Sequence, residues 1–298
     1  PAVVGALISG IILGPSFLDF IEYTDFIQKA SEIGVILLMF MAGLDTDLDE
    51  LKKSGLASFL VAVLGVVLPL LGGFLCFKYM FPEEYANNSL GFLKAVFVGI
   101  TLTATSVSIT VETLREMGKL KGKMGTTIMG AAIIDDILGI IALTIVTSMA
   151  DDSVNIAIVL IKVVAFFAFA AIVGVIFYKF YKKWVDGAKK ELHRHTIVAF
   201  VFCLLMSYIA EAVFGVADIT GAFIAGLIIS NIERSEYLQT KFDTISYMLL
   251  SPVFFASIGL KVVLPKMNFT IVAFAVVLTI VAILTKIIGC GIGAKMCG

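Results

Sequence analysis

Two adjacent aspartates, Asp135 and Asp136, lie well inside a long apolar stretch, residues 125–149, of this 298-residue chain. Neighbouring side chains on an α-helix point about 100° apart, so the two carboxylates can face different surroundings and take different roles. Charge within an apolar span is costly and commonly marks a site that binds or moves ions. The pair therefore indicates ion chemistry, with one carboxylate facing a water-filled cavity and the other a packed helix.

A hydroxyl-rich segment precedes the aspartates. Six of the ten residues from 101 to 110 are Ser or Thr, namely Thr101, Thr103, Thr105, Ser106, Ser108 and Thr110. Such side chains compete for backbone hydrogen bonds and loosen helices. We expect this segment to break in mid-membrane and to offer carbonyl and hydroxyl oxygens to a cation, as interrupted helices do where they line a cavity. The alternative is a hydroxyl-rich packing face between helices.

A lysine, Lys286, lies within the last apolar run of the chain. A buried ammonium group needs an anionic partner, and Asp135 or Asp136 is the obvious candidate. The alternative is that Lys286 extends to the membrane surface, because the run ends shortly after it.

The composition as a whole is typical of a membrane protein. Hydrophobic residues make up 60% of the chain and charged residues 15%, whereas soluble domains have about 45–50% and 25%. In water such a surplus would expose large apolar patches, which argues against a soluble enzyme. The net charge of −1 gives no reason to expect a nucleic-acid partner. The two histidines, His193 and His195, share a charged loop, where we expect both to be solvated.

Ten apolar runs have about the length that a membrane-spanning helix requires, roughly 20 residues. The runs are residues 1–18, 26–44, 55–77, 93–113, 125–149, 154–180, 196–214, 218–232, 244–261 and 269–294. Of the 22 Lys and Arg residues, fifteen fall on one face, five on the other, and Lys162 and Lys286 within spans. Because cytoplasmic loops are enriched in Lys and Arg, Pro1 is predicted on the cytoplasmic side. The sequence predicts an all-α, multi-pass protein of a cell membrane.

Several motifs occur in the order that one family shows. They are Gly5–Pro15, Leu37–Leu44, Thr103–Ser108, Ile133–Gly139, Gly221–Gly226 and Phe254–Leu260. Together they resemble the sodium/proton exchanger domain of the bacterial and archaeal monovalent cation:proton antiporter-2 family, in its NapA-like branch. The resemblance covers residues 1–298. It implies that the domain is truncated at both ends, with a further N-terminal helix before it and a second broken helix after the last run.

The resemblance implies a fold of inverted repeats, in which two broken helices cross, and a homodimer. Each subunit would have scaffold helices from about 1–77 and 154–232 and mobile core helices from about 78–153 and 233–298. The same resemblance assigns Asp136 as the carboxylate that binds cation and proton, and Asp135 as the preceding acidic position. It assigns Lys286 as the core lysine that pairs with Asp135.

We predict a secondary active Na⁺/H⁺ antiporter, not an enzyme, in which cation and proton compete for Asp136. A carboxylate held away from water loses hydration, which favours its protonated form. Asp136 would be a transient ligand of the monovalent cation, and Thr105 and Ser106 would complete its oxygen shell. Entry of the cation would release a proton from Lys286, which couples two protons to one cation. The transported ions are the expected partners, and no cofactor is required.

The remaining two predicted site residues, Thr103 and Ser108, would line the broken helix. Other functions stay open: a K⁺/H⁺ antiporter of the same family, a sodium-coupled solute symporter and an intramembrane aspartyl protease. The protease needs two opposed carboxylates from separate helices, whereas these two are adjacent on one helix. A channel would need repeated carbonyls or charged rings along a pore. The choice among Na⁺, Li⁺ and K⁺ also stays open.

Overall fold

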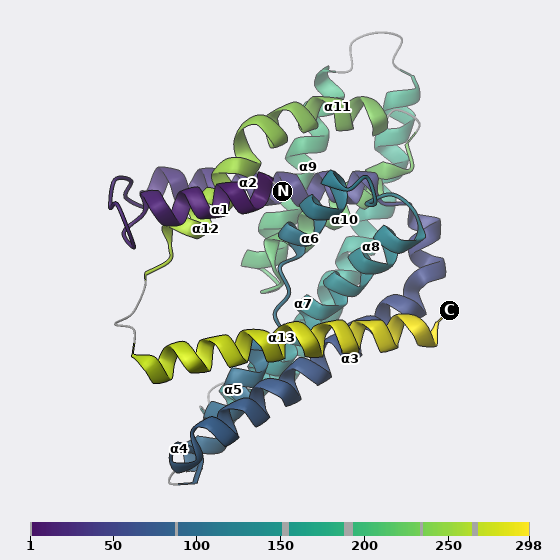
Figure 1. Ribbon diagram of the computed structural model, residues 1–298. Helices are drawn as coiled ribbons and strands as arrows, with labels where there is room; N and C mark the ends of the chain where they lie inside the picture. Colours follow the sequence, from purple (N-terminus) through teal and green to yellow (C-terminus); the bar gives the residue numbers. More distant parts are fainter. Residues whose placement is uncertain are drawn as a thin grey trace. The chain divides into compact units, whose positions relative to one another are not determined.

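The computed structural model describes residues 2–86, 89–150, 155–187, 193–232, 235–263 and 268–297, and over these ranges the regular structure is helical (Figure 1). The α-helices are α1 (Ala2–Leu13), α2 (Asp25–Asp45), α3 (Leu48–Met80), α4 (Pro82–Ala86), α5 (Ser89–Thr103), α6 (Val107–Glu116), α7 (Lys123–Ala150), α8 (Ile156–Asp186), α9 (His193–Ala212), α10 (Asp218–Ser230), α11 (Ser235–Ile245), α12 (Ser251–Leu260) and α13 (Phe269–Met296). The all-α prediction is confirmed. The orientation in the membrane was predicted for Pro1, and this residue lies outside the described residues.

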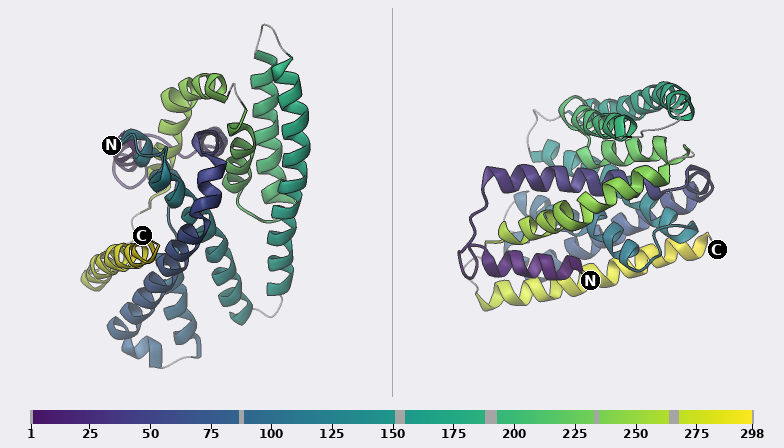
Figure 2. Two further views of the ribbon diagram at one scale, coloured as in Figure 1. Left: turned by 90° about the vertical axis from the view of Figure 1, so that its right-hand side faces the viewer. Right: turned by 90° about the horizontal axis from the view of Figure 1, so that it is seen from above.

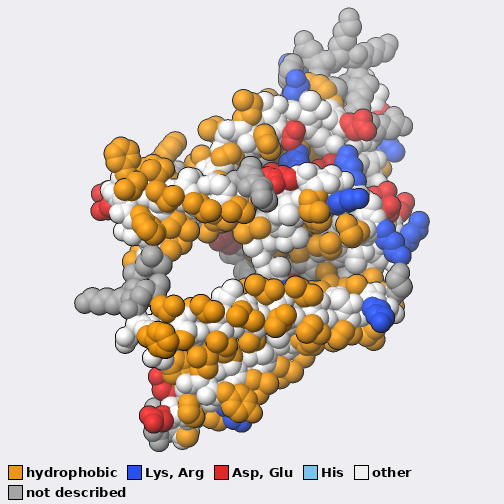
Figure 3. All heavy atoms as spheres, in the orientation of Figure 1, with side chains coloured by type: hydrophobic (Ala, Val, Ile, Leu, Met, Phe, Trp, Pro, Cys, Tyr) orange, Lys and Arg blue, Asp and Glu red, His pale blue; other side chains and the backbone are white. Residues whose placement is uncertain are grey.

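Within the described ranges, eight helical segments are long and apolar enough to cross a membrane, and two apolar helices are shorter. The eight are Asp25–Asp45, Leu48–Met80, Leu90–Glu116, Lys123–Thr147, Ile156–Asp186, Arg194–Ala212, Ser235–Leu260 and Phe269–Met296, and the two are Val3–Leu13 and Asp218–Ser230. Together they coincide with the ten predicted runs. Apolar side chains cover the exposed face of α13 in Figure 3, and only Gly289 and Gly293 of that helix are buried. Such a surface suits contact with lipid.

The chain divides into two compact units, each described by itself. The first unit consists of Pro1–Glu50, Ser108–Thr126 and Val164–Pro265, and the second of Leu51–Val107, Thr127–Val163 and Lys266–Gly298. The predicted division into scaffold and core helices concerns which helices move during transport, and it stays a prediction.

In the first unit, α1 packs against α12, which packs against α2 (Figure 1). Two glycines let α2 and α10 approach closely. A Cβ atom on Gly43 or on Gly226 would overlap a backbone carbonyl oxygen of the other helix, and one on Gly221 would overlap a carbonyl of α9. Small residues permit such close contact of helix backbones. The Gly221–Gly226 stretch therefore packs closely against both α2 and α9.

Helices α8 and α9 lie side by side in both views of Figure 2. Phe177 of α8 stacks on Phe202 of α9, with ring centroids 3.7 Å apart. The expectation that His195 is solvated is wrong: 4% of its surface is exposed, and its ring centroid lies 4.1 Å from that of Trp184. The reason is that α9 already begins at His193, so His195 turns toward the aromatic face of α8. The side chain of His193 lies outside the described residues.

In the second unit, α3 is the element on which α5, α7 and α13 pack. A Cβ atom on Gly99 of α5 would overlap a carbonyl oxygen of α3, and one on Gly289 of α13 would lie 2.5 Å from another. Gly130 of α7 meets the Ser58 side chain of α3, where a Cβ atom would lie 2.6 Å from the hydroxyl oxygen. Small residues thus bring three helices close to the backbone of α3.

Two membrane segments depart from regular α-helix. The first is the hydroxyl-rich segment, in which α5 ends at Thr103 and α6 begins at Val107, so the predicted break is present. The second is a π-helical turn, Ser246–Leu250, that directly precedes α12, and Pro252 lies in the first turn of α12. Proline lacks the amide that a regular helix uses, and the irregular turn lies just before it.

Candidate ion site

The carboxyl group of Asp135 is buried, and its hydrogen-bond and ion-pair partners belong to the second unit. Its side chain is 7% exposed. Asp135 Oδ2 accepts a hydrogen bond from the Thr105 hydroxyl group and forms an ion pair with Lys286 Nζ at 3.3 Å. Asp135 Oδ1 is buried as well, and it has no hydrogen-bond partner among the described residues. The carboxylate therefore has one oxygen, Oδ2, that is occupied by two partners, and a second oxygen, Oδ1, that can still accept a hydrogen bond.

Helix α7 brings Asp135 to this place because small residues on the preceding turn pack on α3. Ala131 forms a buried cluster with Val61 and Ala62 of α3, and Ile134 packs against the same cluster. Small residues on this turn thus let α7 lie close to α3. Gly139 takes no part in this packing, because a Cβ atom there would meet nothing within 4 Å.

Lys286 of α13 is held by three acceptors. Its Nζ donates to the carbonyl oxygens of Gly65 and Thr103, at 2.9 Å each, and to Asp135 Oδ2 at 3.3 Å. An ammonium group has three N–H donors, so every donor finds an acceptor inside the second unit. Lys286 accordingly points into the protein and does not extend to the membrane surface.

The helix break supplies one acceptor to Lys286 and one donor to Asp135. Because α5 ends at Thr103, the carbonyl oxygen of that residue lies in the last turn of the helix. It therefore accepts no hydrogen bond from a helical amide. This carbonyl accepts from Lys286 and, at 3.3 Å, from the Thr105 hydroxyl group. Thr105 is half-buried within the break, and its hydroxyl also donates to Asp135. The break thus presents both a bare carbonyl and a hydroxyl group to the charged pair.

The other predicted site residues take different positions. Asp136 follows Asp135 on α7 and is half-buried, and the structure records no hydrogen bond or ion pair between it and another described residue. Ser106 is exposed within the break. Ser108 is buried in α6 and belongs to the first unit, whereas the Asp135 cluster belongs to the second. The two aspartates therefore differ in their partners, which is the arrangement that two separate roles require.

Gly65 is a site residue that sequence reasoning missed. It lies in the uncharged run 55–77 and takes part through its backbone carbonyl, so its side chain gave no hint. A usable signal was Pro69, because a proline within a helix leaves the carbonyl four residues earlier without its amide donor.

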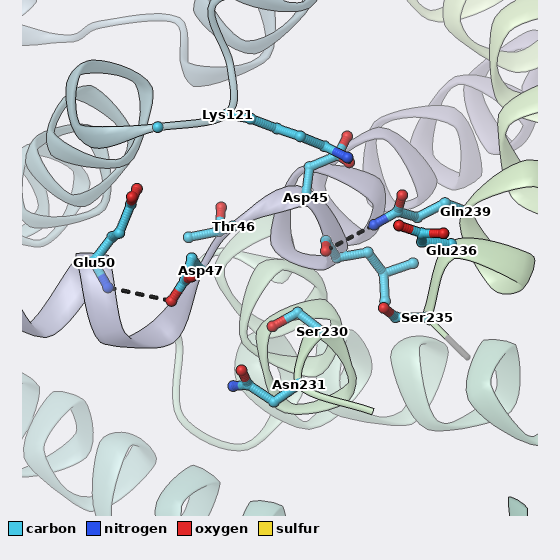
Figure 4. Close-up of a pocket in the computed structure, with 12 residues that line it drawn as sticks. Asp45, Thr46, Asp47, Glu50, Lys121, Ser230, Asn231, Ser235, Glu236 and Gln239 are labelled. Atoms are coloured by element: carbon cyan, nitrogen blue, oxygen red, sulfur yellow. Dashed lines mark hydrogen bonds and ion pairs between the residues drawn. The ribbon is translucent and has the colours of Figure 1, made fainter. Parts of the chain in front are cut away.

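The first unit has a polar cavity of its own, of about 360 Å³, lined by residues that include Asp45, Asp47, Glu50, Lys121, Glu236 and Gln239 (Figure 4). Figure 4 shows Lys121 reaching toward Asp45, and the nitrogen–oxygen distance is 3.4 Å. Across the described part of the chain, no three His, Cys, Asp or Glu side chains are arranged to hold a metal ion. None of the predicted site residues lines this cavity.

Comparison with known proteins identifies the family of the chain. The family model described as "Sodium/hydrogen exchanger, transmembrane" matches residues 1–298. The Na(+)/H(+)-K(+) antiporter GerN of Bacillus cereus is 41% identical over 100% of this chain and 74% of its own length. The Na(+)/H(+) antiporter of Enterococcus hirae is 36% identical over 99% of this chain and 75% of its own length.

A solved structure of the sodium proton antiporter MjNhaP1 from Methanocaldococcus jannaschii shares the fold. It superposes with a TM-score of 0.72 at 20% identity and covers 99% of this chain and 72% of that chain. The superposition shows that the chain has the helical fold of this antiporter structure. The chain belongs to the sodium/hydrogen exchanger transmembrane family.

Proposed function

We propose that the protein is a secondary active monovalent cation:proton antiporter that exchanges Na⁺ for H⁺ across a cell membrane. The family membership and the names of relatives such as GerN support a transporter rather than an enzyme. The observation that carries the proposal is the cluster of Asp135, Thr105 and Lys286 at a helix break, with Asp136 next to it on α7.

The proposed exchange is a competition for one carboxylate, that of Asp136. A proton neutralises this group, and a monovalent cation needs it charged, so each ligand displaces the other. Oxygen atoms near the break, from Thr105 and Ser106, would complete a shell of hard ligands, which suits an alkali cation. No resident cofactor takes part, because both transported ions are substrates.

Asp135 and Lys286 take the second role. Together they are a neutral pair, with the ammonium group held at 3.3 Å from the carboxylate. When a cation binds nearby, its charge opposes that of the ammonium group, and Lys286 would release a proton. Two protons would then exchange for one cation, and each cycle would move net charge.

Transport also needs the site to open to each side of the membrane in turn. In the proposal, helices of about 78–153 and 233–298 form a core that moves against a scaffold of about 1–77 and 154–232, within a homodimer of the NapA-like branch. Such movement of one bundle against another is the general scheme for transporters built from repeats. The Pro1 end would face the cytoplasm.

A second candidate is K⁺/H⁺ exchange at the same site. The observation that favours it is the name of GerN, which includes K⁺ as well as Na⁺. Cation-driven proton movement in liposomes decides between the two. With the purified protein reconstituted and a proton gradient imposed, we expect Na⁺ to dissipate the gradient without any organic solute.

The same measurement with Li⁺ and K⁺ gives the selectivity. Dissipation by K⁺ but not by Na⁺ would replace the first candidate with the second. No dissipation by any of the three cations would contradict an antiporter altogether.

A further inference from the structure

The strongest unexplained contact at the site is the one between Lys286 and α3. Lys286 Nζ donates to the carbonyl oxygen of Gly65 at 2.9 Å. In an α-helix, a carbonyl normally accepts from the amide four residues later. Four residues after Gly65 stands Pro69, and α3 continues as a helix through that proline. Because proline has no N–H group, the helix leaves the Gly65 carbonyl open, and Lys286 occupies it.

The second backbone acceptor of Lys286 is released in a different way. Thr103 ends α5 at the helix break, so its carbonyl lacks a helical amide as well. Two carbonyls, one freed by a proline and one by a helix break, thus converge on one ammonium group, each at 2.9 Å. Asp135 is the third acceptor, and no donor of the ammonium group is left over.

The absence of a side chain at Gly65 serves the same contact. A Cβ atom there would lie 2.9 Å from the Cys290 sulfur and 3.9 Å from Lys286 Nζ. Cys290 follows Lys286 by one turn of α13. A larger residue at position 65 would therefore displace the Cys290 sulfur and press on the side of α13 that carries Lys286, which would lengthen the bond between Lys286 and the carbonyl.

We propose that Gly65 and Pro69 form a positioning element for Lys286, in which Pro69 keeps the Gly65 carbonyl free and that carbonyl holds the ammonium group on Asp135. The inference rests on the proposed function, because it assigns to α3 a part in setting the pH at which Lys286 exchanges its proton. A hydrogen bond to the charged form of a group favours that form. Losing the Gly65 acceptor would therefore make Lys286 release its proton more easily.

The variant Pro69→Ala tests the inference most directly. It returns an amide that competes for the Gly65 carbonyl, and it is mild toward folding, because alanine favours helix. We expect the pH profile of Na⁺-driven proton flux in liposomes to move toward lower pH by on the order of half to one unit. The matched control is Pro252→Ala, a proline that begins α12 in the first unit, and we expect its profile to match the wild type.

A second pair of variants tests the same contact through packing. Gly65→Ala places a methyl group against the Cys290 sulfur, so we expect the profile to move in the same direction. Gly65→Ala combined with Cys290→Ala removes that clash, so the profile should return most of the way to the wild type. This pair decides the matter if Pro69→Ala does not fold.

Wild-type pH profiles in folded Pro69→Ala and Gly65→Ala proteins would overturn the positioning role and leave the exchange itself intact. A wild-type protein without Na⁺-driven flux in the same liposomes would instead contradict the proposed function. The two failures are therefore distinguishable.

Discussion

Two lysine–aspartate pairs in this protein have nearly the same geometry and very different surroundings. Lys286 and Asp135 lie 3.3 Å apart, and Lys121 and Asp45 lie 3.4 Å apart. The aspartates are similarly enclosed, with 7% and 10% of their side chains exposed. The lysines differ, because Lys286 is 26% exposed and Lys121 is 68% exposed.

The difference lies in what else each ammonium group can reach. Lys121 lies in the connection between α6 and α7, where water can replace its partner at small cost. Lys286 lies within an apolar helix, and its other two donors end on backbone carbonyls. Exposed ion pairs contribute about 0–1 kcal/mol, whereas loss of one partner from a buried pair strands a charge at a cost of about 3–5 kcal/mol. Distance alone therefore does not distinguish the two pairs, whereas the burial of the lysine does.

The largest expected effect is that of Asp136→Asn. The amide cannot bind and release a proton or supply a negative charge to a cation, so Na⁺-driven proton flux should fall to the background of empty liposomes. The matched control is Asp45→Asn, the same substitution in the pair of the first unit, for which we expect flux close to the wild type. Sodium-dependent flux that survives in Asp136→Asn would show that another group carries the ions.

The next largest effect concerns Lys286→Ala. Without the ammonium group, Asp135 is expected to take up a proton instead, and the second proton of the cycle is lost. Exchange should become electroneutral while Na⁺ still drives proton flux. Transport currents across a supported membrane measure this directly, with Lys286→Arg as the variant that keeps the charge. An unchanged charge movement per cycle in Lys286→Ala would remove this residue from the coupling.

A smaller effect is expected for Thr105→Val. The substitution keeps the shape of the side chain and removes the hydroxyl group that donates to Asp135, while the ion pair with Lys286 remains. Loss of a hydrogen bond to a charged group lowers binding affinity by roughly tenfold. The Na⁺ concentration that gives half-maximal flux should therefore rise by up to about that factor. Thr147→Val is the control on α7, the helix of Asp135, because the Thr147 hydroxyl donates only to its own helix backbone in the described contacts. Equal Na⁺ dependence in both variants would exclude Thr105 from the site.

The smallest effect is expected for Lys121→Gln. An exposed ion pair contributes about 0–1 kcal/mol, so the thermal stability and the Na⁺ dependence of the flux should both stay close to the wild type. A large loss of flux in this variant would erase the distinction between the two pairs and give the polar cavity of the first unit a part in transport.

The sequence predicts the features that depend on side-chain type along the chain. The sequence predicts the ten apolar runs and the break between Thr103 and Val107. It also predicts the partnership of a lysine within a span with one of two aspartates. These features leave a signal because burying charge or breaking a helix inside a membrane is costly, and few residue types permit it.

Other features depend on the folded arrangement and could not be predicted. Which aspartate pairs with Lys286 follows from how α7 is rotated against α3: the residues alone left both open, and only the resemblance assigned Asp135. The Gly65 carbonyl is a backbone group that every residue has, so only its contact with Lys286 distinguishes it. His195 was misplaced because the boundary of α9, and not the charge of the neighbouring loop, decides its burial.

The most direct test of the account is the affinity for Na⁺ as a function of pH, measured by calorimetry on the purified protein. If cation and proton compete for Asp136, Na⁺ binding should weaken as the pH falls, approaching about tenfold per pH unit once the carboxylate is mostly protonated. The Asp136→Asn protein should bind Na⁺ weakly at every pH. Equal affinity of the wild-type protein for Na⁺ at acid and alkaline pH would contradict the competition on which the proposed exchange depends.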